Sequence, residues 1–136
     1  MTITIDGGAG ITFPDTVQQT NGMTMTGGNP LYYAARAWVN FNGSGTVAIR
    51  AAVNVSSITD SGLGIYLVNF TTAMPDVNYA AVLVGQQNNG TTSNQCISLL
   101  AASDGGIYST TQFTIFGQAS NGNQVDSEIV CAAVFR

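Results

Sequence analysis

From Leu31 onward the chain alternates short apolar runs with turn residues, and this pattern constrains the fold more than any other feature. Strands are predicted where β-branched and aromatic residues recur over short runs. Asn-Gly pairs, which supply the positive φ angles of tight turns, separate several of them. No stretch has a helical periodicity of useful length. The predicted strands are Ala35–Phe41, Thr46–Val55, Ile65–Phe70, Tyr79–Gln86, Gln95–Ala101, Thr110–Phe116 and Ser127–Phe135.

Seven short strands with turn signals between them predict an all-β fold, an antiparallel β-sandwich of jelly-roll-like form. Residues 1–30 differ from this pattern, since Gly-rich turns interrupt two short alternating runs and few large apolar residues are present. We therefore expect an extended N-terminal docking arm over residues 1–30 and a sandwich domain over residues 31–136; the alternative is a flexible tail. The arm residues expected to dock, by adding a strand to a partner's sheet, are Ile3, Ile5, Ile11 and Phe13.

Only 7% of the residues are charged, lysine is absent, and the formal net charge is −4. A surface built from uncharged polar residues is cheap to bury against another protein. The lack of basic runs argues against nucleic-acid binding. No apolar run is long enough to cross a bilayer, so no membrane insertion is expected. The first residues lack the features of a secretory signal, which favours synthesis in the cytosol.

Alternation along the first two predicted strands indicates a candidate subunit interface. Arg36 and Trp38 point away from the apolar residues of their strand. If Val47, Ile49, Ala51, Val53 and Val55 form the core face of the next strand, Arg50 lies on the same surface as Arg36 and Trp38. An arginine beside a tryptophan is typical of protein interfaces. The alternative is a tryptophan that covers the sandwich edge.

Tyr79–Gln86 and Ser127–Phe135 are apolar on both faces. Such strands are either central in a sheet, or one of their faces packs against another subunit.

Catalytic chemistry is not indicated. Without histidine or lysine the commonest general bases are missing, and neither a metal site nor any cofactor is expected. Asp126 and Glu128 are the one close acidic pair, and we interpret them as a solvated strand edge. Asp60, Asp76 and Asp104 lie in turn sequences, where aspartate tightens the backbone. Cys96 and Cys131 lie in apolar runs and are expected to be half-buried free thiols, with a disulfide as the alternative.

Two stretches carry a resemblance to a known family. ARAWVNFNGSGTVAIRA (35–51) and VSSITDSGLGIYLVNFTTAMPDVNYA (55–80), preceded by GITFPDTVQQT (10–20), resemble a tail-fibre-like module of tailed-phage virion proteins. The resemblance implies a non-enzymatic structural protein of the virion, made in the host cytoplasm. It also implies a homotrimer that is joined to other virion proteins by the N-terminal arm. The implied role is that of a tail fibre or fibre tip; the alternatives are a capsid decoration (cement) protein and a carbohydrate-binding lectin-like module.

Receptor recognition is predicted at the longest run of hydrogen-bonding side chains, Gln86–Gln95. Amide and hydroxyl groups suit the hydroxyl groups of a host surface glycan, and Tyr108 is predicted to add a stacking ring. The alternative is an ordinary solvated loop. The candidate receptor residues are Gln86, Gln87, Asn88, Asn89, Asn94 and Tyr108.

Overall fold

A computed structural model describes residues 4–6, 10–12, 18–19, 34–86 and 95–136. The chain divides into two compact units, Met1–Ala34 and Ala35–Arg136. Within the first unit, three short strands, β1 (Thr4–Asp6), β2 (Gly10–Thr12) and β3 (Gln18–Gln19), form an antiparallel sheet in which Ile5 pairs with Ile11. Ile3 and Phe13 lie outside the described residues. The docking role of this segment therefore stays a prediction.

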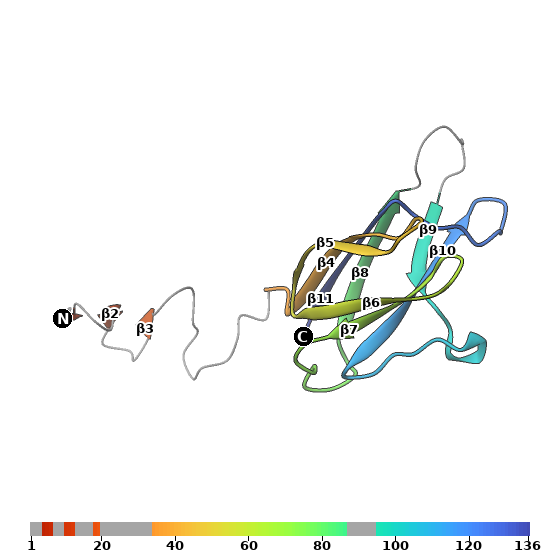
Figure 1. Ribbon diagram of the computed structural model, residues 1–136. Coiled ribbons are helices and arrows are strands. Elements are labelled where there is room, and N and C mark those ends of the chain that lie inside the picture. Colours follow the sequence, from red (N-terminus) through yellow and green to blue (C-terminus); the bar gives the residue numbers. More distant parts are fainter. Residues whose placement is uncertain (1–3, 7–9, 13–17, 20–33, 87–94) are drawn as a thin grey trace. The chain divides into compact units, whose positions relative to one another are not determined.

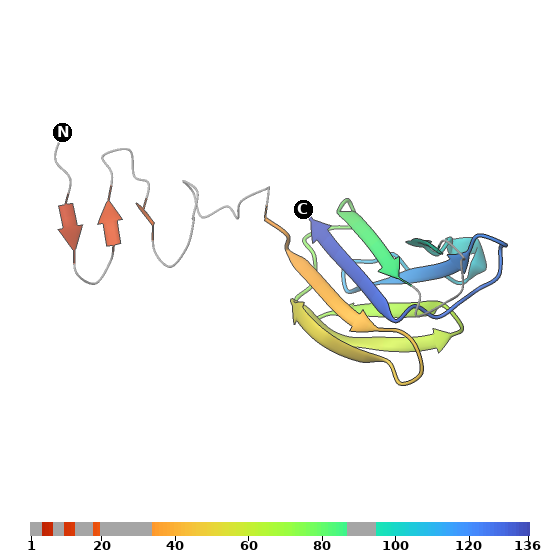
Figure 2. The same cartoon turned by 90° about the horizontal axis from the view of Figure 1, so that it is seen from above.

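The second unit is built from two four-stranded antiparallel sheets with the strand orders β5-β4-β11-β8 and β6-β7-β10-β9 (Figures 1 and 2). The predicted all-β antiparallel sandwich is confirmed. A 3₁₀ segment, Ala102–Asp104, joins β9 to β10. No helix of the described part of the chain is long and apolar enough to span a membrane. The strands are β4 (Ala37–Asn42), β5 (Ala48–Val53), β6 (Val55–Gly62), β7 (Ile65–Phe70), β8 (Ala80–Gln86), β9 (Gln95–Leu99), β10 (Gln112–Ala119) and β11 (Ile129–Phe135).

Among the strands of the second unit, β6 is the one that the sequence analysis missed. Its polar sequence, VSSITDSG, carries little apolar alternation, and most of its residues are exposed on the outside of the sandwich. Asp60, which was expected in a turn, lies within β6, and its Oδ1 accepts the N–H of Gly62 at 3.1 Å. The turn itself follows at Leu63 and Gly64. Pairing with β7, rather than apolar content, makes this segment a strand.

The core lies between the two sheets. Its fully buried large side chains alternate along β4, β7, β10 and β11, as the period of two of a strand requires. Aromatic rings meet edge to face across the layers, with Phe41 and Tyr66 at a centroid distance of 5.2 Å. The largest buried side chains are Tyr66, Phe41, Phe113, Ile115, Val39, Val68, Val130 and Val134.

The Tyr66 hydroxyl closes one end of this core. It lies 2.9 Å from the carbonyl oxygen of Gly43 and 3.1 Å from Asp126 Oδ1, and it accepts the N–H of Ser127 at 3.3 Å. Asp126 Oδ1 also accepts the N–H of Gly64 at 2.8 Å. Burial raises the pKa of the Tyr66 hydroxyl, which therefore stays a donor at neutral pH. Segments about sixty residues apart in the chain are tied together here.

An ion pair fastens the opposite end of the sandwich domain. Arg136 and Asp76 form two hydrogen bonds, of 2.8 and 2.6 Å, and Asp76 Oδ1 also accepts the N–H of Asn78 at 2.8 Å. Hydrogen bonding from Arg136 lowers the pKa of the Asp76 carboxyl from 3.8. Asp76 thus holds a turn, as its sequence context predicts.

This pKa shift predicts a small pH-dependent contribution to stability. A carboxyl whose pKa is lower in the folded state stabilises the fold above the unfolded-state pKa, and this contribution is lost as the pH falls through the folded-state pKa. We therefore expect Asp76→Asn to lower the melting temperature slightly at pH 6, and the difference from the native chain to shrink below pH 3.8. Thermal unfolding followed by circular dichroism between pH 2 and pH 6 measures this. A difference that is constant across the series would contradict it.

Candidate functional site

The outer face of the β5-β4-β11-β8 sheet exposes apolar side chains that the core does not use. The strand register places two rows of residues side by side across it: Val53, Trp38, Ala133 and Val82 in one row, and Ala51, Asn40, Cys131 and Val84 in the next. We call these eight residues the apolar face. Val82 and Val84 are 62% and 61% exposed, and Val53 is 48% exposed. Large aliphatic side chains on a solvent-facing sheet mark a binding surface when they are contiguous.

A shallow groove runs along the apolar face between Trp38 and β8. Its volume is about 370 Å³. The polar groups of its lining are the Asn40 amide, the Trp38 indole N–H and the Cys131 thiol, and the other five residues are aliphatic. The lining residues are Trp38, Val39, Asn40, Val82, Val84, Cys131, Ala132 and Ala133.

A β-bulge decides which residues of β5 reach this face. Asn40 pairs with Ala51 and Phe41 pairs with Ile49, so Arg50 is an extra residue on β5. One extra residue reverses the alternation beyond it. The predicted core face of this strand is therefore wrong at Ala51 and Val53, which point outward, whereas Ala52 packs against the core.

The strand also ends earlier than the alternation suggested. Asn54 has a φ of 54° and separates β5 from β6. Its amide bonds Thr72, donating to the carbonyl oxygen at 3.1 Å and accepting the N–H at 2.8 Å. The chain crosses here from one sheet to the other, which is why Val55 still packs against the core.

Asn40 is the polar centre of the apolar face. Its Nδ2 donates to Cys131 Sγ at 3.2 Å. Its Oδ1 is buried and has no hydrogen-bond partner among the residues that the structure describes. An unpaired buried acceptor of this kind typically costs about 1–3 kcal/mol.

The outer face of β6 is polar, and Asn69 of β7 bonds it, while the other outward residues of β7, Ile65 and Leu67, are half-buried. Asn69 Nδ2 donates to Ser57 Oγ at 3.1 Å and to Thr59 Oγ1 at 3.2 Å, which forms a small polar network across the two strands. Ser57 and Thr59 are exposed. The outward side of β6 is therefore polar and suits contact with water. The apolar face of the other sheet exposes valines instead.

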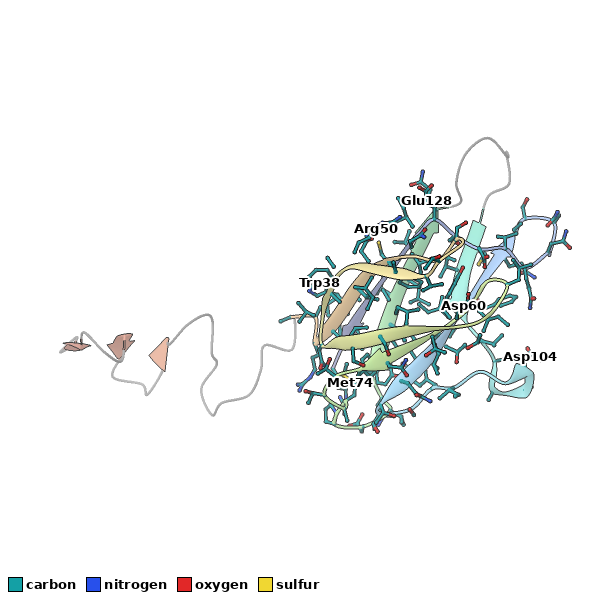
Figure 3. The ribbon with its side chains drawn as sticks, in the orientation of Figure 1. Trp38, Arg50, Asp60, Met74, Asp104 and Glu128 are labelled. Carbon is teal, nitrogen blue, oxygen red and sulfur yellow. The ribbon has the colours of Figure 1, made fainter. Side chains whose placement is uncertain are left out.

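Of the three residues predicted as a subunit interface, Trp38 lies in the apolar face and is 38% exposed. Arg36 immediately precedes β4 and is partly exposed. Arg50 lies at the other end of β4, where its Nη1 donates to the carbonyl oxygens of Phe41 at 3.0 Å and Glu128 at 2.7 Å (Figure 3). The two arginines therefore lie on either side of Trp38 along β4.

The predicted receptor residues are only partly described. Gln86 ends β8, and Gln87, Asn88, Asn89 and Asn94 lie outside the described residues. Tyr108 stacks on Tyr79, which directly precedes β8, with a centroid distance of 4.3 Å, and its hydroxyl donates to the Tyr79 carbonyl oxygen. Roughly 20 Å of strand separates that end of β8 from Gln86. The prediction that Tyr108 and Gln86 form one site is therefore wrong, because these two residues lie at opposite ends of β8.

The acidic side chains and the thiols of the described residues are dispersed. Asp60, Asp104 and Glu128 lie apart in Figure 3, while Asp126 is bonded to backbone and to Tyr66. No group of three or more metal-ligating residues gathers within the described part of the chain. Cys96 and Cys131 are free thiols on different sheets, and Cys96 is exposed rather than half-buried.

No protein-family model matches the chain, and no curated protein matches it in sequence. Among solved structures, the fold is similar to that of the phiAB6 tailspike, whose crystal structure is a complex with three-repeated oligosaccharides of Acinetobacter baumannii surface polysaccharide. The TM-score is 0.52 at 16% sequence identity, and the match covers 98% of this chain and 27% of the tailspike. The chain thus spans about a quarter of the tailspike's length and shares its fold with a part of it.

Proposed function

We propose that this chain is a non-enzymatic structural protein of a phage virion, a component of a trimeric tail fibre or fibre tip that attaches the particle to its host. The observation that carries the proposal is the fold likeness to part of a phage tailspike over 98% of the chain. The sequence resemblance of residues 35–51 and 55–80 to a tail-fibre-like module supports the proposal independently. The N-terminal unit, Met1–Ala34, is then the segment that joins the chain to the particle.

A structural role also agrees with the chemistry of the described residues. Asp76 and Asp126 are engaged in hydrogen bonds that hold turns and strand ends together. The groove on the apolar face offers one amide, one indole N–H and one thiol in an otherwise aliphatic lining, which suits protein contact better than catalysis. We place recognition of a host surface glycan in the Gln86–Gln95 segment, whose side chains are amides and hydroxyls.

Locating and counting the chain in purified particles tests this function. Gold-labelled antibody and electron microscopy, together with quantitative mass spectrometry, should find a small number of copies, in multiples of three, at the tail. Alanine at Gln86, Gln87 and Asn88 should then lower host adsorption without removing the chain from the particle. Copies spread over the capsid shell would replace the proposal by a decoration protein. Absence from the particle would leave the lectin-like alternative.

A further inference from the structure

We infer that the apolar face is the surface through which copies of this chain pack on one another, and that Asn40 fixes their register. The inference rests on the trimer in the proposed function and assigns it a contact surface. The face consists of Val53, Trp38, Ala133 and Val82 with Ala51, Asn40, Cys131 and Val84.

Charge points to a second copy as the occupant. None of the eight residues is charged, so a charged partner would lose its hydration there without compensation. A nucleic acid or an anionic membrane surface requires clustered basic residues. A glycan requires several convergent hydrogen-bonding groups, and beside the Trp38 ring with its indole N–H the face has one amide. An equally uncharged surface fits, and each copy of this chain carries one.

The contrast between the two outer faces supports the same occupant. On β6 the outward Ser57 and Thr59 accept hydrogen bonds from Asn69 of β7 and suit water. On β8, also an edge strand, the outward Val82 and Val84 are more than half exposed. Covering these valines and Trp38 removes apolar area from water at about 25 cal/mol per Å².

The size of the face determines how the contact must be measured. Four strands at about 4.8 Å spacing and two rows of residues, about 13 Å of strand length, give a plan area of roughly 250 Å². That is about a third of the roughly 800 Å² that each partner contributes to a standard interface. Association through this face is therefore expected to depend on concentration, with dissociation on dilution.

Asn40 gives the contact its register. Its Nδ2 is bonded to Cys131 Sγ at 3.2 Å, and its Oδ1 has no partner in the described part of the chain. An amide has a second N–H and a second lone pair, so a turn of the side chain lets the Asn40 residues of three copies, whose apolar faces meet at a threefold axis, bond one another in a ring. A single polar residue in an apolar contact selects the arrangement in which it is satisfied, at some cost in affinity.

The first experiment uses the full chain and two matched charge substitutions. Val82→Asp places a carboxylate in the apolar face, and Thr59→Asp places one on the polar outer face; both positions are exposed on edge strands. Multi-angle light scattering over a hundredfold concentration series should show the native chain and Thr59→Asp assembling, and Val82→Asp assembling at least tenfold more weakly. Circular dichroism confirms that each variant is folded. Equal assembly of both variants would overturn the inference and leave the trimer standing.

Native mass spectrometry of Asn40→Val tests the register. We expect tighter association but a mixture of stoichiometries, whereas the native chain shows one. A single unchanged stoichiometry in Asn40→Val would overturn the role of Asn40. A native chain that forms only dimers, which Val82→Asp dissociates, would support the face and refute the trimer of the proposed function. A native chain that is monomeric throughout the series would refute both.

Thiol labelling provides a second measurement, because the two cysteines lie on different sheets. Maleimide should label Cys131 more slowly in the assembled native chain than in Val82→Asp. Cys96 should react at the same rate in both. Equal Cys131 rates at a concentration where the native chain is assembled would contradict packing on this face.

Discussion

Phe113→Ala is expected to lower the free energy of unfolding by about 3–5 kcal/mol. Phe113 is fully buried on β10, and its ring centroid lies 5.6 Å from that of Phe70 and 6.3 Å from that of Tyr79. Truncation removes the buried apolar area and leaves a cavity between the two sheets. A loss of this size is a large fraction of the stability of a domain, typically about 5–15 kcal/mol.

Phe116→Ala is the matched control for this substitution. Phe116 lies on the same strand but on its outer side, and it is partly exposed. Its truncation should cost less than about 2 kcal/mol. Urea unfolding followed by circular dichroism, at one fixed protein concentration, measures both. Similar losses for the two phenylalanines would mean that the core does not lie between the sheets as described.

Gly43→Ala is expected to destabilise the domain by about 2–4 kcal/mol through overpacking and loss of hydrogen bonds. A Cβ at this position would lie 2.6 Å from Cζ and Oη of Tyr66 and 2.9 Å from the carbonyl oxygen of Ser127. Gly43 already bonds both neighbours, because its carbonyl oxygen lies 2.9 Å from the Tyr66 hydroxyl and its N–H donates to the carbonyl oxygen of Ser127 at 2.9 Å. Neither the backbone nor the enclosed ring has room to move away.

Gly45→Ala separates this steric effect from the general cost of replacing a turn glycine. Gly45 lies in the same hairpin, has a φ of +66°, and has nothing within 4 Å of an added Cβ. We expect it to cost only about 1 kcal/mol, from the left-handed backbone conformation. The same urea titration compares the two. If Gly45→Ala proved the more damaging change, the close approach of Tyr66 to Gly43 would be wrong.

The candidate site was predictable from the sequence only in part. The regular alternation along its strand predicts that Trp38 points away from the core, and the structure confirms this orientation. The apolar character of Tyr79–Gln86 and Ser127–Phe135 on both faces predicted either central strands or contact with a partner. The structure makes β11 central and β8 an edge strand, and for the outward Val82 and Val84 the second alternative stays a prediction. No local signal distinguished the two strands.

The sequence by itself determined the all-β class, most of the strands and the uncharged surface, because alternation, turn chemistry and composition are local properties. Only the tertiary structure decided which side chains face outward. The bulge at Arg50 reverses the alternation of β5 through its pairing with β4, and the polar β6 becomes a strand through its pairing with β7. Asp126 likewise forms hydrogen bonds with Tyr66 and Gly64, which lie about sixty residues away in the chain. Register and strand order arise from contacts between distant segments, and such contacts leave no pattern within any one of them.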